Sequence, residues 1–286
     1  VQLVVGFYLI PSGTSFQKMG EIMMKAMSDP KNVNSLRFLQ VISTLLMMGL
    51  PSYFFLRLCH TNNWQWLGFS KYLNIQQVLF GFFFIFCANL VAQPLVNLSK
   101  YIVSFNQTWV QKAEALEKMY NEQVALMSNL SGGGEFIIAI FIIAFLPALF
   151  EEMFFRGALQ NTLQRWWKKP IIAIVVTSII FSAIHFSIYL FLSRFLLGLV
   201  LGWIFYKSRN IWVGTLVHFL NNLFALAQIF VMSKTKVKID VSKLDAELPW
   251  WGIVISFVFL LIFGYLFQRA SERNAEAIRK KEILLF

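Results

Sequence analysis

The chain has 286 residues, of which 58% are hydrophobic and only 14% charged, whereas soluble domains carry about 25% charged residues. A soluble globule has too little interior to bury so many apolar side chains, so the composition indicates a polytopic membrane protein. The net charge of +11 is spread over loops between apolar runs, which suits anionic lipid headgroups better than nucleic acid. We therefore expect membrane lipids, and no nucleic acid, as partners. The two cysteines, Cys59 and Cys87, are too few for a disulfide scaffold or a thiolate zinc site.

Apolar runs that approach the length needed to cross a bilayer, about 17–25 residues, follow one another along the chain. They predict an all-α, polytopic transmembrane bundle of about eight helices in a single membrane domain over residues 1–286, with the first helix truncated at its start. The expected helices cover residues 1–10, 38–58, 78–95, 136–155, 171–186, 189–206, 211–232 and 250–267.

Two connecting segments, residues 15–27 and 110–127, have the amphipathic pattern of helices that lie in the membrane interface. After the second of them, Ser131 and the three glycines that follow it are expected to form a flexible break before the next helix.

Acidic and histidine side chains occur in only three of the apolar runs. A charged side chain near the bilayer centre costs at least about 2.5–3.5 kcal/mol on insertion scales, so an intramembrane one needs a reason. These polar groups occur in the runs at 136–155, 171–186 and 211–232 and are almost absent from the others. We therefore predict that they form one site in a catalytic helical core over residues 136–231. The three motifs are Glu151-Glu152-x-x-x-Arg156, Phe181-x-x-x-His185 and His218-x-x-x-Asn222.

Two of the three polar residues of the first motif, Glu152 and Arg156, can be explained by an ion pair that only stabilises the helix. Glu152 and Arg156 have the i,i+4 spacing of a same-face ion pair, which can also form at the end of a membrane helix. Glu151 points about 100° around the helix from Glu152, so that pair does not account for it. Pro147 lies four residues before Glu151 and is expected to kink the helix and open space beside the carboxylate.

The two histidine motifs, taken singly, also fit plain packing. His185 could lie buried under the ring of Phe181, and His218 with Asn222 could form an interhelical hydrogen-bond pair. It is the occurrence of all three motifs together that favours a functional site.

A helical hairpin brings the first two motifs to one depth. Residue 168 is equidistant from Glu151 and His185, and it lies in a polar turn that ends with Pro170 at the expected start of the next helix. In an antiparallel hairpin, residues equidistant from the turn face each other. For Glu151, His185 and His218 to lie at one depth, the polar residues 160–169 must extend their helix beyond the membrane. The helix that carries His185 is then short for a full crossing of the bilayer.

In this order, the three motifs resemble the CAAX-protease and bacteriocin-processing (Abi) family of intramembrane peptidases. The family pattern is Glu-Glu-x-x-x-Arg, then Phe-x-x-x-His, then His-x-x-x-Asn or Asp. The glycine that often follows the arginine is present as Gly157, and Gly198 and Gly202 also resemble the family. The resemblance covers about residues 145–225.

The resemblance implies a membrane-embedded endopeptidase acting on a membrane-associated peptide or protein, and a location in the bacterial cytoplasmic membrane. It implies that Glu151 activates a water for attack on the peptide carbonyl, with help from His185. His218 and Asn222 would stabilise the oxyanion or orient that water. Glu152 and Arg156, supported by Phe181, would hold the geometry of the first motif.

A zinc-dependent version of the same protease is the alternative mechanism. Glu151, His185 and His218 match a catalytic zinc shell in type and number. They come from three helices, without a His-Glu-x-x-His helix to fix two ligands, so we favour direct water activation without a cofactor. If Glu151 bound the metal, Glu152 would be the spare base.

Two other classes of protein compete with the enzyme. A bacteriocin-immunity or scaffold protein could keep the fold without catalysis, but its motifs would be expected to be degraded, and all three are intact here. A transporter could use the polar cluster as an ion site, but inverted repeats typical of transporters are not visible. The substrate stays open between a lipidated CAAX protein, a maturing peptide and another membrane protein.

Overall fold

The computed structural model describes residues 29–58, 63–127, 133–234 and 248–283. Within these ranges the regular structure is helical and contains no strand, which confirms the predicted all-α class. The expected helix at residues 1–10 and the amphipathic segment at 15–27 lie outside the described residues.

Six helical segments of the described chain are long and apolar enough to cross a membrane, as expected for an integral multi-pass membrane protein. Val33–Leu58 combines α3 (Val33–Thr44), the π-helical η2 (Leu45–Gly49) and α4 (Leu50–Leu58), and Gly133–Trp167 combines five consecutive elements. The other four are α5 (Ile75–Ser104), α11 (Phe191–Ser208), α12 (Ile211–Lys234) and α13 (Trp250–Ile283).

The span expected at residues 171–186 is shorter than predicted. Helix α10 covers only Pro170–Ala183 and is followed by a turn that contains His185. At about 1.5 Å per residue a helix of 14 residues reaches roughly 21 Å, less than the hydrocarbon thickness of about 30 Å. The expected run over 171–186 therefore does not continue as a helix through His185.

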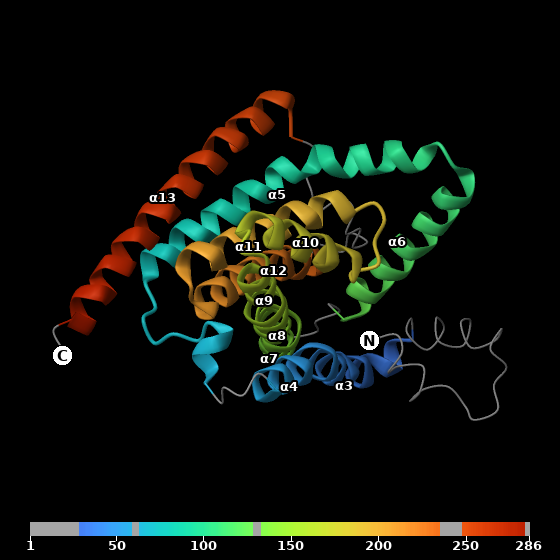
Figure 1. Cartoon of the computed structure of the whole chain (residues 1–286). Coiled ribbons are helices and arrows are strands. Elements are labelled where there is room, and N and C mark those ends of the chain that lie inside the picture. Colours follow the sequence, from blue (N-terminus) through green and yellow to red (C-terminus); the bar gives the residue numbers. More distant parts are fainter. Residues whose placement is uncertain (1–28, 59–62, 128–132, 235–247, 284–286) are drawn as a thin grey trace.

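Helices α5 and α13 run beside each other along one side of the molecule, and α10, α11 and α12 lie between them and the α7–α9 segment (Figure 1). One apolar core joins α5, α11, α12 and α13, with Ile85, Leu201, Val217 and Phe267 almost completely buried. This core fixes the rotation of α12, which carries the third motif.

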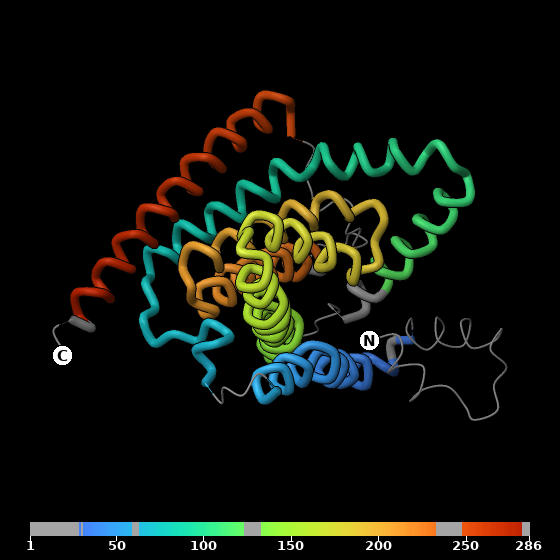
Figure 2. Tube along the Cα trace, viewed as in Figure 1, coloured from blue at the N-terminus to red at the C-terminus, as the bar shows by residue number. Residues whose placement is uncertain are grey.

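The first motif lies on a long, continuous helical path from Gly133 to Trp167, which Figure 2 traces without a break. It comprises α7 (Gly133–Ala139), η4 (Ile140–Phe145), α8 (Leu146–Glu152), η5 (Met153–Gln160) and α9 (Asn161–Trp167), of which η4 and η5 are π-helical. Pro147 lies at the start of α8, directly after η4, where a wider turn accommodates a residue without an N–H. The polar residues after Gln160 extend this helix, as the sequence predicted.

The turn between the first two motifs lies where the sequence placed it. Helix α9 ends at Trp167, Lys168 has a left-handed conformation with φ 55°, and Pro170 begins α10. Glu151 and His185 thus lie on the two arms of one hairpin.

The predicted amphipathic stretch at 110–127 is part of helix α6 (Gln107–Met127). Most of its described side chains are exposed and Ala113 is buried. Of the expected glycine break, Ser131 and Gly132 lie outside the described residues, and Gly133 and Gly134 form the first turn of α7.

Candidate active site

The first motif forms a buried ion pair, as its spacing predicted. A nitrogen of Arg156 lies 3.0 Å from Oε1 of Glu152, and both side chains are at most 1% exposed. Arg156 also lies over the ring of Phe181, with 4.8 Å between the guanidinium carbon and the ring centroid. The second motif's aromatic residue therefore covers the ion pair from the neighbouring helix.

His218 lies between the two glutamates of the first motif. Its Nδ1 is 3.2 Å from Oε1 of Glu152, and its Nε2 is 3.9 Å from Oε2 of Glu151. Because a carboxylate accepts hydrogen bonds, the contact with Glu152 places a proton on Nδ1 of His218. Glu152 thus binds the third motif as well as Arg156, a contact that its sequence spacing did not indicate.

His185 lies in the turn after α10, at the open end of the hairpin, and is half-buried. Its Nδ1 is 2.6 Å from the carbonyl oxygen of Phe181. A carbonyl can only accept, so Nδ1 of His185 donates and Nε2 is left as the acceptor. The ring of Phe181 contacts both imidazoles, with centroid distances of 4.7 Å to His185 and 6.2 Å to His218. His185 thus lies beside His218, whose Nε2 approaches Glu151, and a direct contact of Glu151 with His185 stays a prediction.

Glu151 and Glu152 have different surroundings. Glu152 is completely buried and carries an ion pair and a hydrogen bond, whereas the side chain of Glu151 is 13% exposed. Its nearest described charge partner, His218, stays beyond hydrogen-bond distance at 3.9 Å. Glu151 is thus the carboxylate that has room for a further ligand.

The two asparagines of α12 bind other helices. The amide of Asn222 donates to the carbonyl oxygen of Ala144 at 3.4 Å. Asn221, next to it, accepts a hydrogen bond of 2.6 Å from Asn89 of α5. Asn222 follows His218 by one helical turn, so the two side chains lie on the same face of α12, as predicted.

Three residues near the site were missed in the sequence. Asn89 anchors Asn221, and Arg194 donates to the carbonyl oxygen of His185 at 3.3 Å. A Cβ at Gly214 would lie 2.8 Å from Oε2 of Glu152, so only glycine leaves room for that carboxylate. Asn89 and Arg194 were detectable as isolated polar residues within apolar runs, but a glycine gives no such signal.

The glycines that the sequence singled out allow close helix contacts. A Cβ at Gly157 would meet the carbonyl oxygen of Leu67 at 2.8 Å, and one at Gly198 would meet Cβ of Ser178 at 2.9 Å. The carbonyl groups of Gly198 and Gly202 accept hydrogen bonds from Arg156 and Gln160, at 3.4 and 2.9 Å. Helix α11 therefore packs closely on both arms of the hairpin.

The alternative role for the three motif side chains Glu151, His185 and His218 is zinc binding. In the described ranges of the chain, no group of three His, Cys, Asp or Glu side chains converges in an arrangement that could hold a metal ion. Glu151, His185 and His218 are neighbours, but His218 directs its Nδ1 to Glu152 and His185 directs its own to a backbone carbonyl. We therefore derive no step through a metal.

Carboxylate groups of the first motif and the imidazole of α12 thus meet among the helices of a multi-pass membrane protein. In a comparison with protein families, residues 133–224 match the family described as type II CAAX prenyl endopeptidase Rce1-like, so this segment is similar to that family. The matched segment contains all three motifs, which confirms the predicted resemblance to the CAAX-protease family. Comparisons with curated proteins and with solved structures gave no match.

Proposed function

We propose that this protein is an intramembrane endopeptidase in which Glu151 activates the attacking water. The main support is the contrast between the two glutamates: Glu152 is occupied by Arg156 and His218, while Glu151 is partly accessible and lacks a hydrogen-bonded partner among the described side chains. A water bound to Glu151 would lose its proton to the carboxylate as its oxygen attacks the peptide carbonyl. The proton then passes to the leaving amine.

His185 assists this step. Because its Nδ1 donates to the carbonyl oxygen of Phe181, its Nε2 can accept a hydrogen bond from the same water and orient it. Arg194 positions the histidine by holding its backbone carbonyl. The site thus offers two acceptors for one water, one on each arm of the hairpin.

Asn222 supplies a hydrogen bond to the oxyanion, and His218 supplies another when it is an imidazolium that carries a proton on Nε2 as well as the Nδ1 proton donated to Glu152. Glu152 fixes the ring of His218, whose Nε2 faces the side of Glu151 on which the water would lie. The amide of Asn222 has two N–H groups, and its bond to Ala144 uses one of them. Fixed donors in a site from which water is excluded stabilise developing negative charge effectively.

The reaction proposed here needs no cofactor. The substrate is a peptide segment of a membrane-associated protein, with a prenylated CAAX peptide as the first candidate, since the matched family is described by that chemistry. We place the protein in the bacterial cytoplasmic membrane as one membrane domain whose catalytic core is residues 136–231.

Cleavage by purified protein in liposomes tests the proposal. A prenylated CAAX peptide, its unprenylated counterpart and an unrelated apolar peptide are offered to the wild type and to Glu151→Gln, and the products are identified by mass. We expect cleavage by the wild type only. Equal product from the variant would overturn the role of Glu151, and the absence of cleavage of the prenylated peptide would overturn the proposed substrate.

A further inference from the structure

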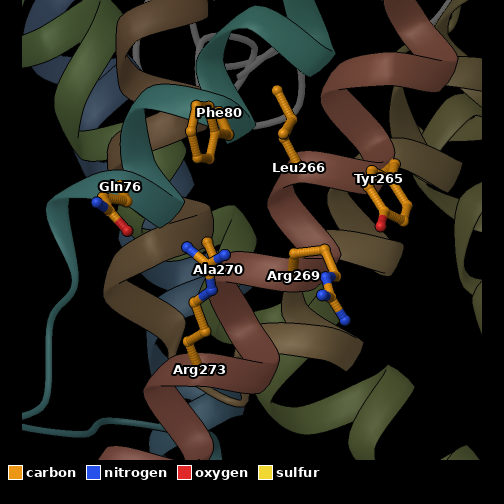
Figure 3. Close-up of a pocket in the computed structure, with 7 residues that line it drawn as sticks. All are labelled: Gln76, Phe80, Tyr265, Leu266, Arg269, Ala270 and Arg273. Carbon is orange, nitrogen blue, oxygen red and sulfur yellow. The ribbon is translucent and has the colours of Figure 1, made fainter.

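A cavity lined by none of the motif residues lies between the start of α5 and the middle of α13. Its volume is about 260 Å³. Figure 3 shows that Gln76 and Phe80 reach it from α5, whereas Tyr265, Leu266 and two arginines come from α13. The arginines are Arg269 and Arg273, one helical turn apart, and the side chain of Arg273 extends back along α13 toward Ala270 (Figure 3).

The depth of this cavity relative to the membrane follows from α13. Residues 250–267 carry no charged side chain, and at about 1.5 Å per residue they span nearly the ~30 Å of the hydrocarbon core. Exposed Trp250 and Trp251 mark one end of this stretch and Tyr265, 60% exposed, marks the other, as aromatic residues do at membrane surfaces. The two arginines therefore lie at the headgroup level.

Hydrogen bonds between α5 and α13 fix the walls of the cavity at this level. Buried Gln77 donates to Ser271 at 3.0 Å, and Asn274 donates to Gln77 at 3.4 Å. Asn74, which caps the start of α5, donates to Asn274 at 3.5 Å. These hydrogen bonds hold together the two helices that supply the polar rim (Gln76, Arg269 and Arg273) and the apolar floor (Phe80 and Leu266) of the cavity.

The charge of the cavity is positive. Arg269 has one weak partner, Glu272 at 3.8 Å, and both side chains are about half exposed. Within the part of the chain that the structure describes, Arg273 has no ion-pair partner. An anion at the rim would therefore meet two guanidinium groups and one acidic neighbour.

We infer that this cavity binds the headgroup of an anionic phospholipid. The phosphate lies between Arg269 and Arg273, with Gln76 as a further donor, and the acyl chains leave over Phe80 and Leu266 along the exposed apolar surface of α13. The cavity is too small for a whole lipid, so it recognises the headgroup while the membrane solvates the chains. Guanidinium groups bind phosphate through paired, charge-assisted hydrogen bonds.

Titration of the purified protein with phosphatidylglycerol or phosphatidylcholine, with bound lipid counted by native mass spectrometry, tests this site. We expect tighter binding of phosphatidylglycerol, and we expect the exchange Arg269→Gln with Arg273→Gln to weaken it about tenfold or more, given the contribution of each basic residue near a lipid surface. The matched control is Arg279→Gln with Lys280→Gln, which removes the same charge from exposed positions further along α13. This control should bind the lipid as the wild type does.

Three results would overturn the inference. Equal binding of the two lipids by the wild type would show that the site does not select the anionic headgroup. An equal loss of lipid binding in the control variant would show that the effect depends only on the net charge of the protein. Displacement of the lipid by glycerol phosphate or inorganic phosphate at equal concentration would identify a soluble anion as the ligand. The melting temperature of both variants reports folding, which should be unchanged because all four side chains are exposed.

Discussion

Among individual residues, Glu151 and Glu152 are adjacent and chemically identical, yet the structure gives them different neighbours. Glu152 lies between Arg156 and His218 with no exposed surface, and Glu151 lies at the edge of the same cluster. Substituting each by glutamine separates a role in catalysis from a role in holding the site.

Glu151→Gln should abolish peptide cleavage while leaving the protein folded. The amide cannot take a proton from water, and loss of a general base costs typically about 10²–10⁴-fold in rate. Turnover in liposomes and the melting temperature in detergent measure the two effects. Glu276→Gln, at an exposed position of α13, is the matched control, and comparable turnover by the Glu151 variant would refute its assignment.

Glu152→Gln should lower the stability more than Glu151→Gln does. It leaves Arg156 as a buried charge without its counterion, and breaking a buried pair in this way costs about 3–5 kcal/mol. Turnover should also fall, although less than in Glu151→Gln, because His218 loses its anchor. Thermal unfolding measures the loss. The double variant with Arg156→Met should recover part of it, and a double variant no more stable than the single would argue against the ion pair.

At the level of the elements, α11 determines how closely the two arms of the hairpin approach. Gly198 lies against the backbone of Ser178 on α10, and its carbonyl accepts from Arg156 on the other arm. A side chain at this position would push α10 away, and α10 leads directly into His185.

Gly198→Ala should therefore destabilise the protein and reduce cleavage together. The added methyl group would lie 2.9 Å from Cβ and 3.1 Å from Cα of Ser178, and overpacking of this kind costs typically about 1–3 kcal/mol. Gly252→Ala on α13 is the control, since its nearest neighbour is at 3.6 Å. Melting temperature and turnover are compared for the two variants. Equal behaviour would show that the close approach of α10 and α11 is unimportant.

At the scale of the whole molecule, hydrogen bonds connect the polar ends of several helices on one face. Arg209 after α11 donates to Gln164 of α9, and Asn210 donates to the carbonyl oxygen of Tyr72 before α5. The bond between Asn74 and Asn274 adds α13 to this face. The basic residues of the Lys168 turn and of α13 are thereby gathered on one side, and from these basic clusters we predict that this side faces the cytoplasm.

Single cysteines at Lys168 and Lys280, in a background with Cys59→Ser and Cys87→Ser, should be labelled by a membrane-impermeant thiol reagent only after the cells are opened. Both positions lie on the basic face, so both should behave alike. Labelling of both in intact cells would invert the orientation. Labelling of only one of the two cysteines in intact cells would show that positions 168 and 280 lie on opposite sides of the membrane.

The cleavage activity of the whole protein should survive a chelator. With Glu151 acting on water directly, elemental analysis should find far less than one zinc per chain. His185→Gln and His218→Asn, which keep hydrogen-bonding groups, should retain residual activity. If the protein holds about one zinc per chain and loses it together with activity when a chelator is added, the metal-dependent mechanism is the correct one.

The sequence by itself determined the all-α membrane fold, the hairpin turn at Lys168 and the ion pair of Glu152 with Arg156. These features depend on local information: the length of apolar runs, the conformational restriction of Pro170 and the i,i+4 spacing on a helix. The match to an Rce1-like segment was also predicted from the residues of the three motifs and their order.

Only the tertiary structure decided which side chains meet between helices. The contact of His218 with Glu152, the bond of Asn221 with Asn89 and the space that Gly214 leaves beside Glu152 depend on the depth and rotation of each helix. The membrane-spanning helices are hydrophobic on most of their surface, so periodicity does not reveal which face of each is buried. Packing of the helices against one another sets their rotation, and that rotation assembles the site.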